Sequence, residues 1–142
     1  MITSDYIVGL VDGEGSFTVY IKNPDDSTEL KRRARAEPKF YLKLIEKDKD
    51  ILYELKDFFG CGNVYFQKDT RNNHQHCYRY EVTSRNDLAE IIIPFFKQNA
   101  LQLESKKNDF FLFCDLMEKI ERDEHLTKEG LRNLLIIKKK MH

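Results

Sequence analysis

The stretch "YIVGLVDGEGSF", residues 6–17, joins an apolar segment to two carboxylates that alternate with two glycines. The spacing of the apolar residues predicts a short helix over residues 4–13. Asp12 and Glu14 then fall at the C-terminal end of that helix, where the helix dipole carries partial negative charge and favours cations. Carboxylates in this position raise the question of which partner offsets their charge.

The composition is that of a single globular domain over residues 1–142. Charged residues make up 34% of the chain and hydrophobic residues 41%. No apolar run approaches the roughly 18 residues of a membrane span, and the N-terminus lacks the basic segment of a signal peptide. Cys61, Cys77 and Cys114 are odd in number and lack the spacing of zinc ligands. We therefore expect reduced thiols, an intracellular location and no membrane partner.

The formal net charge is zero, which argues mildly against a simple nucleic-acid-binding domain. The charges are unevenly distributed, however. Residues 31–49 carry eight cations and three anions, a net charge of +5, whereas residues 109–129 carry a net charge of −4. Either the first segment attracts phosphate and the second repels it, or both are ordinary solvated faces.

Two pairs of strands and several helices are predicted from hydrophobic periodicity. Strands are expected at 16–23, 38–46, 63–69 and 76–84, and helices at 4–13, 48–62, 86–99, 105–125 and 127–142. The order α-β-β-α-β-β-α-α-α predicts an α+β fold, in which an antiparallel four-stranded sheet carries its helices on one face. Pro94 is expected to interrupt the helix over 86–99, and Gly60 to end the helix that precedes it.

Polar residues at the predicted helix starts are candidate N-caps, because their side-chain oxygens can accept from free backbone amides. These candidates are Ser4 or Asp5, Asp48 or Asp50, Ser105, and Thr127.

The sheet face opposite the helices is predicted to be cationic and aromatic. The strand alternation places the following residues on it: Tyr20, Lys22, Lys39, Tyr41, Lys43, Tyr65, Gln67 and Arg79. A curved β-ribbon with such side chains can lie in the major groove of DNA. These eight residues are the candidate DNA-binding set.

Three segments of the sequence resemble the LAGLIDADG homing endonucleases. Residues 7–15 fall on the nine-residue motif of that family, with Glu14 where the motif has its last aspartate. "KLIEKDKDILYELKDFFGCGNV" (43–64) and "IIIPFFKQNALQLESKKNDFFLF" (91–113) resemble later family segments in the same order. The resemblance covers roughly residues 5–114. It implies the αββαββα fold of that family, with a saddle-shaped sheet.

Gly9 and Gly13 lie four residues apart, so they share one face of the helix. Another backbone can approach such a face closely. The partner is either the predicted helix over 48–60 of the same chain or, as the resemblance implies, a second copy across a two-fold axis. Because the chain has one motif, the family pattern implies a homodimer. Its expected interface residues are Tyr6, Gly9, Leu10 and Gly13.

The resemblance assigns Glu14 as a metal ligand, with the Gly13 carbonyl oxygen as a second ligand. Two carboxylates brought together near two helix C-termini repel each other unless they are protonated or bind metal. Mg²⁺ prefers such oxygen ligands. We expect Mg²⁺ as the cofactor and Ca²⁺ to support DNA binding without cleavage. Asp12 is expected to be structural and to bond backbone amides near the motif.

Two more catalytic residues are implied by the resemblance. Glu46 stands where the family has a polar residue that positions water, and Lys106 where it has a lysine that stabilises transition-state charge. Lys107 is the alternative if the register shifts by one residue. A further family cation falls on Asp50, so that its role is either missing or taken by Lys49. As alternatives, Glu46 is an ordinary strand-end acid and Lys106 an ordinary surface lysine.

The implied function is site-specific cleavage of double-stranded DNA by a homodimer, at a long and roughly palindromic target. The resemblance also implies a cut across the minor groove that leaves 3′ overhangs, and a mobile intron as genetic context. The alternatives are an RNA maturase or a DNA-binding protein that does not cleave, and less directly a transcription regulator on the same scaffold. An intact Glu14 and Lys106 favour the enzyme.

Overall fold

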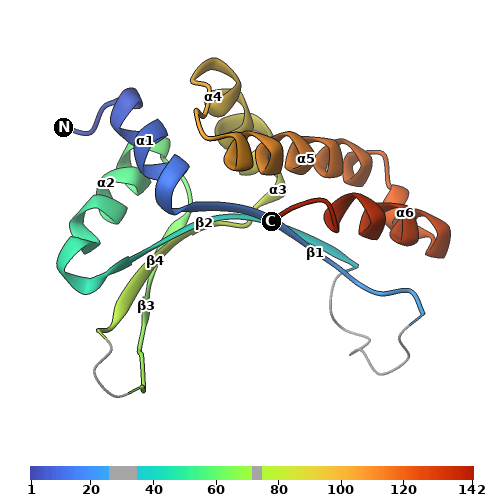
Figure 1. The fold of residues 1–142 in the computed structure, drawn as a ribbon, viewed down its shortest axis with the longest axis horizontal. Coiled ribbons are helices and arrows are strands. Elements are labelled where there is room, and N and C mark those ends of the chain that lie inside the picture. Colours follow the sequence, from blue (N-terminus) through green and yellow to red (C-terminus); the bar gives the residue numbers. More distant parts are fainter. Residues whose placement is uncertain (26–34, 72–74) are drawn as a thin grey trace.

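Four strands form one antiparallel sheet in the order β1-β2-β4-β3. The structure is a computed structural model that describes residues 1–25, 35–71 and 75–142. The strands are β1 (Gly15–Ile21), β2 (Ala36–Ile45), β3 (Asn63–Gln67) and β4 (Cys77–Val82). Each predicted strand is therefore confirmed, with ends that differ by a few residues. In Figure 1 the sheet arches beneath the helices, which gives it the predicted saddle shape.

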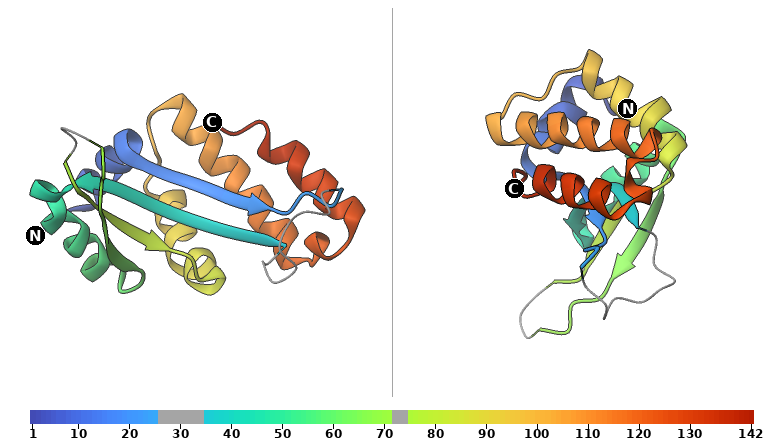
Figure 2. Two further views of the ribbon diagram at one scale, coloured as in Figure 1. Left: turned by 90° about the horizontal axis from the view of Figure 1, so that it is seen from below. Right: turned by 90° about the vertical axis from the view of Figure 1, so that its right-hand side faces the viewer.

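All helices cover the upper, convex side of the sheet (Figure 1). The α-helices are α1 (Ser4–Glu14), α2 (Lys49–Phe59), α3 (Arg85–Asp87), α4 (Ile93–Gln98), α5 (Glu104–Glu121) and α6 (Lys128–Lys138). Short 3-10 turns, Glu46–Asp48 and Glu124–Leu126, precede α2 and α6. Seen from below, the long strands β1 and β2 lie in front of the helices, so the opposite sheet face is uncovered (Figure 2).

The predicted interruption at Pro94 is confirmed, and it has a specific form. A π-helical turn, Leu88–Ile92, separates α3 from α4, and Pro94 lies in the first turn of α4. Proline has no backbone N–H to donate within a helix, and the irregular π turn lies directly before α4, which carries Pro94.

The core lies between the sheet and the helices, and aromatic rings fill its centre. Phe17 of β1 packs on Phe40 of β2 with ring centroids 5.0 Å apart, and on Phe113 of α5 at 5.4 Å. Phe40 and Phe113 are completely buried, as is Leu42. The inward positions of β2 were predicted from its alternation, because only one face of this sheet is covered. No helix in the described part of the chain is long and apolar enough to cross a membrane.

Two of the predicted N-caps are wrong. The α1 cap is Thr3, whose hydroxyl accepts from the Tyr6 amide at 3.2 Å, and Ser4 and Asp5 lie inside the helix. Helix α5 begins at Glu104 after Leu103, so Ser105 is also internal. The Thr127 cap of α6 is confirmed.

The remaining helix ends follow the sequence more closely. Asp48 occupies the N-cap position of α2, as predicted, although its side chain makes no capping hydrogen bond. Gly60 ends α2 in the left-handed conformation with a φ of 69°, which favours glycine.

Candidate functional site

Helix α1 buries one side and exposes a stripe on the other. Its buried residues are Ile7, Val8, Val11 and Asp12. Tyr6 is 50% exposed, Gly9 and Gly13 are exposed, and Leu10 is half-buried between them. A Cβ added at either glycine would meet nothing within 4 Å. The alternative in which these glycines allow close packing against α2 is therefore wrong.

Glu14 is the last residue of α1, and its side chain is exposed. The turn into β1 that follows it is tight. A Cβ at Gly15 would lie 2.6 Å from Cγ1 of Val11, so this position accepts only glycine without rearrangement. The Gly15 amide donates to the Val11 carbonyl and closes the helix. The glycine after Glu14 thus keeps its carboxylate at the end of the exposed stripe.

Asp12 faces the other way and is 9% exposed. Both of its carboxylate oxygens accept from the Gln102 amide at 3.0 Å, and Oδ1 also accepts from the Leu103 amide at 3.2 Å. The expectation that Asp12 bonds backbone amides is confirmed, but their expected place near the motif is wrong. They belong to the segment that leads into α5, about 90 residues further along the chain.

This attachment brings the start of α5 to the end of α1. The Lys106 ammonium donates to the backbone carbonyl of Gly15, the residue after Glu14. Lys107 instead lies 3.7 Å from the carboxylate of Glu104 in the first turn of α5. Of the two candidate lysines, the structure therefore brings Lys106 to the motif.

Glu46 directly follows the last residue of β2, in the 3-10 turn before α2. Its side chain is exposed, and its amide donates to the His76 carbonyl at 3.0 Å. The nearby Lys49 ammonium lies 5.3 Å from the centre of the Tyr78 ring on β4. No hydrogen bond or ion pair within the described residues joins Glu46 to Glu14 or Lys106.

The oxygen donors at the end of α1 suit a hard divalent cation. Glu14 offers a carboxylate, and the last turn of a helix leaves backbone carbonyls such as that of Gly13 without intrahelical partners. Within residues 1–25, 35–71 and 75–142, no group of three or more His, Cys, Asp or Glu side chains could hold a metal ion. The carboxylate of Glu14 and the carbonyl of Gly13 are ligands of the kind that magnesium and calcium prefer.

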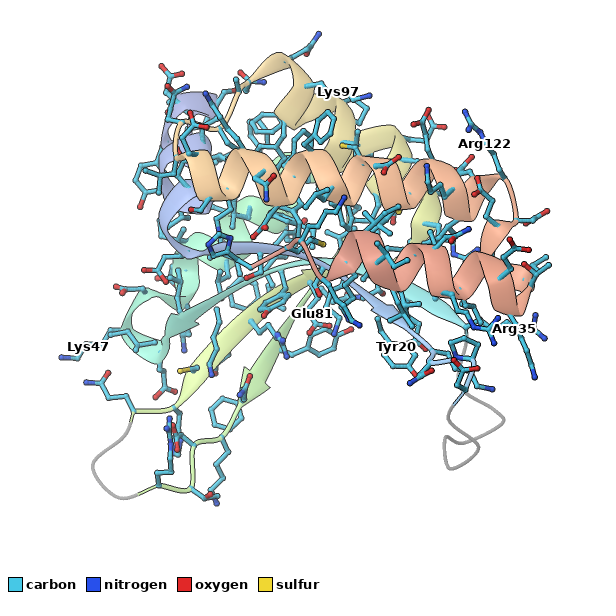
Figure 3. All side chains as sticks on the ribbon, turned by 45° about the vertical axis from the view of Figure 1, so that its right-hand side comes forward. Tyr20, Arg35, Lys47, Glu81, Lys97 and Arg122 are labelled. Atoms are coloured by element: carbon cyan, nitrogen blue, oxygen red, sulfur yellow. The ribbon has the colours of Figure 1, made fainter. Side chains whose placement is uncertain are left out.

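The uncovered sheet face carries the predicted polar set. The strand register pairs Lys43 and Tyr65 with Arg79, from either side of β4, and pairs Thr18 with Lys39. Tyr20 lies on this underside in Figure 3, whereas Lys97 and Arg122 lie on the helical side. Lys22 lies one residue beyond the end of β1. The eight candidate residues thus come from all four strands or their ends.

Sequence reasoning missed an acid at the centre of this face. Glu81 lies on β4 two residues after Arg79, and Figure 3 shows it at the sheet, below the helices. Its carboxylate lies 2.9 Å from Nε of Arg79 and 3.7 Å from Nζ of Lys39. The signal was present, because the alternation that places Arg79 on this face also places Glu81 there.

The described part of the basic segment (31–49) and the acidic segment (109–129) lie in different parts of the fold. In the acidic segment, Asp115 pairs with Lys119 at 3.0 Å and Glu118 with Arg122 at 3.7 Å, both on α5. Part of the basic segment, residues 31–34, lies outside the described residues. The acids therefore sit on the helical side, away from the uncovered sheet face.

Comparisons with known proteins place this arrangement in a family. The family model described as "LAGLIDADG endonuclease" matches residues 7–117. "Probable intron-encoded endonuclease 3" of Neurospora crassa is 34% identical over 135 residues, which cover 94% of this chain and 24% of that protein. The chain thus spans about a quarter of the length of this relative.

Solved structures agree with the family match. The crystal structure of the homing endonuclease I-TnaI is 35% identical, covers 99% of this chain and 88% of its own, and gives a TM-score of 0.80. The LAGLIDADG homing endonuclease I-SmaMI, bound to cleaved DNA, is 29% identical with a TM-score of 0.82, over 100% of this chain and 44% of its own. I-SmaMI has also been solved with an uncleaved DNA target in the presence of calcium ions. With its motif at the α1–β1 turn and its sheet uncovered on one face, the chain belongs to the LAGLIDADG endonuclease family.

Proposed function

We propose that this protein is a site-specific double-strand DNA endonuclease that acts as a homodimer with a divalent metal ion. Its target is a long and roughly palindromic duplex. The observation that carries the proposal is the end of α1, where an exposed glycine stripe leads to the exposed Glu14 and Lys106 reaches the next residue.

The proposed dimer follows from the exposed stripe. Gly9 and Gly13 leave room for a second helix, and Tyr6 and Leu10 offer apolar surface beside them. A two-fold axis along this stripe would bring the two Glu14 carboxylates together. That arrangement would add the oxygen ligands of the second chain to those of the first, and a divalent cation prefers several oxygen ligands.

The proposed chemistry assigns one task to each residue. Glu14 and the Gly13 carbonyl hold the metal ion, which supplies a more acidic water and stabilises charge on the phosphate oxygens. Glu46 orients the attacking water, and Lys106 adds positive charge near the scissile phosphate. The uncovered sheet face binds the duplex through Lys22, Lys39 and Lys43, together with the other members of the candidate set. The structure of I-SmaMI bound to an uncleaved DNA target in the presence of calcium ions supports the use of a divalent ion.

The test uses a plasmid library that carries randomised duplex inserts. We expect Mg²⁺ to support cutting of a small set of related inserts by the wild-type protein, and Ca²⁺ to support binding without cutting. Sequencing of the cut ends gives the target and the overhang. Binding without any cut in Mg²⁺ would instead favour a DNA-binding protein, and binding of RNA alone would favour a maturase. We also propose an intracellular location, because the proposed substrate is DNA.

A further inference from the structure

Arg79, in the middle of the uncovered sheet face, is held on two sides. Its guanidinium carbon lies 4.3 Å from the centre of the Tyr41 ring, so the ring supports one face of the group. Its Nε forms an ion pair with the Glu81 carboxylate at 2.9 Å, although the N–H is not aligned for a hydrogen bond with it. The Arg79 side chain is 29% exposed and that of Glu81 16% exposed, so water screens this pair only in part.

What remains of the guanidinium is the edge that carries its two terminal nitrogens. Neither of them donates a hydrogen bond to a residue that the structure describes. Two parallel N–H donors on a planar group match the O6 and N7 acceptors of guanine in the major groove. An arginine that is already oriented loses less side-chain entropy when it makes that contact.

We propose that Glu81 is a positioning residue that holds Arg79 to read a guanine in the target DNA. The inference rests on the proposed function, because it assumes that the sheet face lies in the major groove. It adds a substrate property: the target contains a G·C pair at the position that Arg79 reaches, with guanine preferred roughly 5- to 150-fold over other bases.

The negative charge of Glu81 distinguishes a positioning role from general electrostatic attraction to DNA phosphates. A carboxylate on a surface that faces phosphates weakens binding to every duplex, whatever its sequence. Glu81 also holds Lys39 at 3.7 Å and so offsets a second cation of the face. Specificity is a difference between affinities, so a residue that lowers general affinity while fixing one base contact raises discrimination. Loss of Glu81 should therefore tighten general binding and relax base choice.

The experiment selects bound sequences from randomised duplexes in Ca²⁺ and measures affinity for one scrambled duplex by gel shift. We expect wild type to enrich guanine at a position where Arg79→Ala, which has no side-chain donors, does not, with the other positions unchanged. Glu81→Gln should reduce enrichment at that same position at least threefold and bind the scrambled duplex more tightly. Thermal unfolding establishes that both variants are folded.

Glu37→Gln is the matched control, because Glu37 carries a carboxylate on the same face of β2, opposite Tyr20 of β1. It should tighten binding to the scrambled duplex and leave the guanine preference unchanged. An unchanged preference in Glu81→Gln, or a change at a position that Arg79→Ala does not affect, would overturn the inference while the proposed function stands. Failure of the wild-type protein to bind any duplex would overturn both.

Discussion

At the end of α1 and on the uncovered sheet face, an acidic side chain fixes the position of a basic side chain, but the contacts differ. At the end of α1, the buried Asp12 bonds the backbone amides before α5, and that backbone carries Lys106 to Gly15. On the sheet, Glu81 contacts the side chain of Arg79 directly. Backbone hydrogen bonds resist salt, whereas a partly exposed ion pair is screened by it. The first region is thus suited to fixed chemistry, and the second to an adjustable contact with DNA.

The largest expected effect tests the α1 end. Glu14→Gln keeps the shape of the side chain and removes the charge that we propose holds the metal. We expect cleavage in Mg²⁺ to fall by several orders of magnitude, while gel-shift affinity in Ca²⁺ stays within about tenfold, because affinity comes from the sheet face. Glu104→Gln is the control, since this nearby carboxylate is 93% exposed and should not affect cleavage. Equal losses of binding and cleavage would make Glu14 a structural residue.

A second prediction concerns how Asp12 places Lys106. Asp12→Ala leaves two backbone amides without their acceptor, so we expect the free energy of unfolding to fall by about 1–3 kcal/mol. Cleavage should fall roughly 10- to 100-fold, by analogy with the loss of other supporting contacts. If Asp12 acts through Lys106, Asp12→Ala should reduce cleavage little further in a Lys106→Ala background.

Asp12→Asn is the conservative comparison for this cycle. It keeps one oxygen that can accept from both amides, so it should retain most of the stability and most of the cleavage. Independent losses that multiply in the Asp12→Ala, Lys106→Ala double variant would show that Asp12 supports the fold without placing the lysine.

The exposed stripe of α1 gives the third prediction. Gly9→Leu should weaken dimerisation by about 1–3 kcal/mol, because a bulky residue overpacks a close helix contact. Nothing lies within 4 Å of the added Cβ in one chain, so the monomer should instead gain helix stability of up to about 1 kcal/mol. Light scattering reports the mass and thermal unfolding the stability. The control is Asn133→Leu on the exposed side of α6, which should leave the mass at twice 16.9 kDa.

The smallest expected effect tests the sheet face through its response to salt. The logarithm of affinity should fall linearly with the logarithm of salt concentration, by roughly 0.9 per phosphate neutralised. Lys22→Ala and Lys43→Ala should each reduce that slope by up to about this amount. Lys107→Ala, near Glu104 on the helical side, should leave it unchanged. A flat response to salt in the wild type would show that this face does not bind phosphates.

The buried residues of a helix or strand could be predicted from the sequence wherever only one of its faces is buried. The alternation in β2 identified Phe40 and Leu42 as core residues, and both are fully buried. Helix starts were less predictable, because Thr3 rather than Ser4 or Asp5 caps α1. Adjacent polar residues have nearly equal capping propensity, so local sequence does not discriminate among them.

The residues of the candidate site could be predicted from the sequence only in part. The motif pointed to Glu14, and its family resemblance pointed to Lys106 with Lys107 as an alternative. The choice between the two lysines depends on the direction in which each leaves α5, and that direction depends on where the start of α5 is attached. The alternation of side chains along β4 places Glu81 on the same face as Arg79. The candidate DNA-binding set did not include Glu81, because an acid repels phosphate.

The sequence by itself determined the order of strands and helices, the uncovered sheet face and the exposed carboxylate at the end of α1. These depend on periodicity and on neighbours within a few residues, which the chain displays directly. Only the tertiary structure decided that Asp12 serves the amides of Gln102 and Leu103, that Lys106 reaches Gly15, and that Glu81 holds Arg79 and Lys39. Each of these contacts joins separate elements or depends on a side-chain direction, and hydrogen bonds and ion pairs require distances and angles that only the packed chain provides.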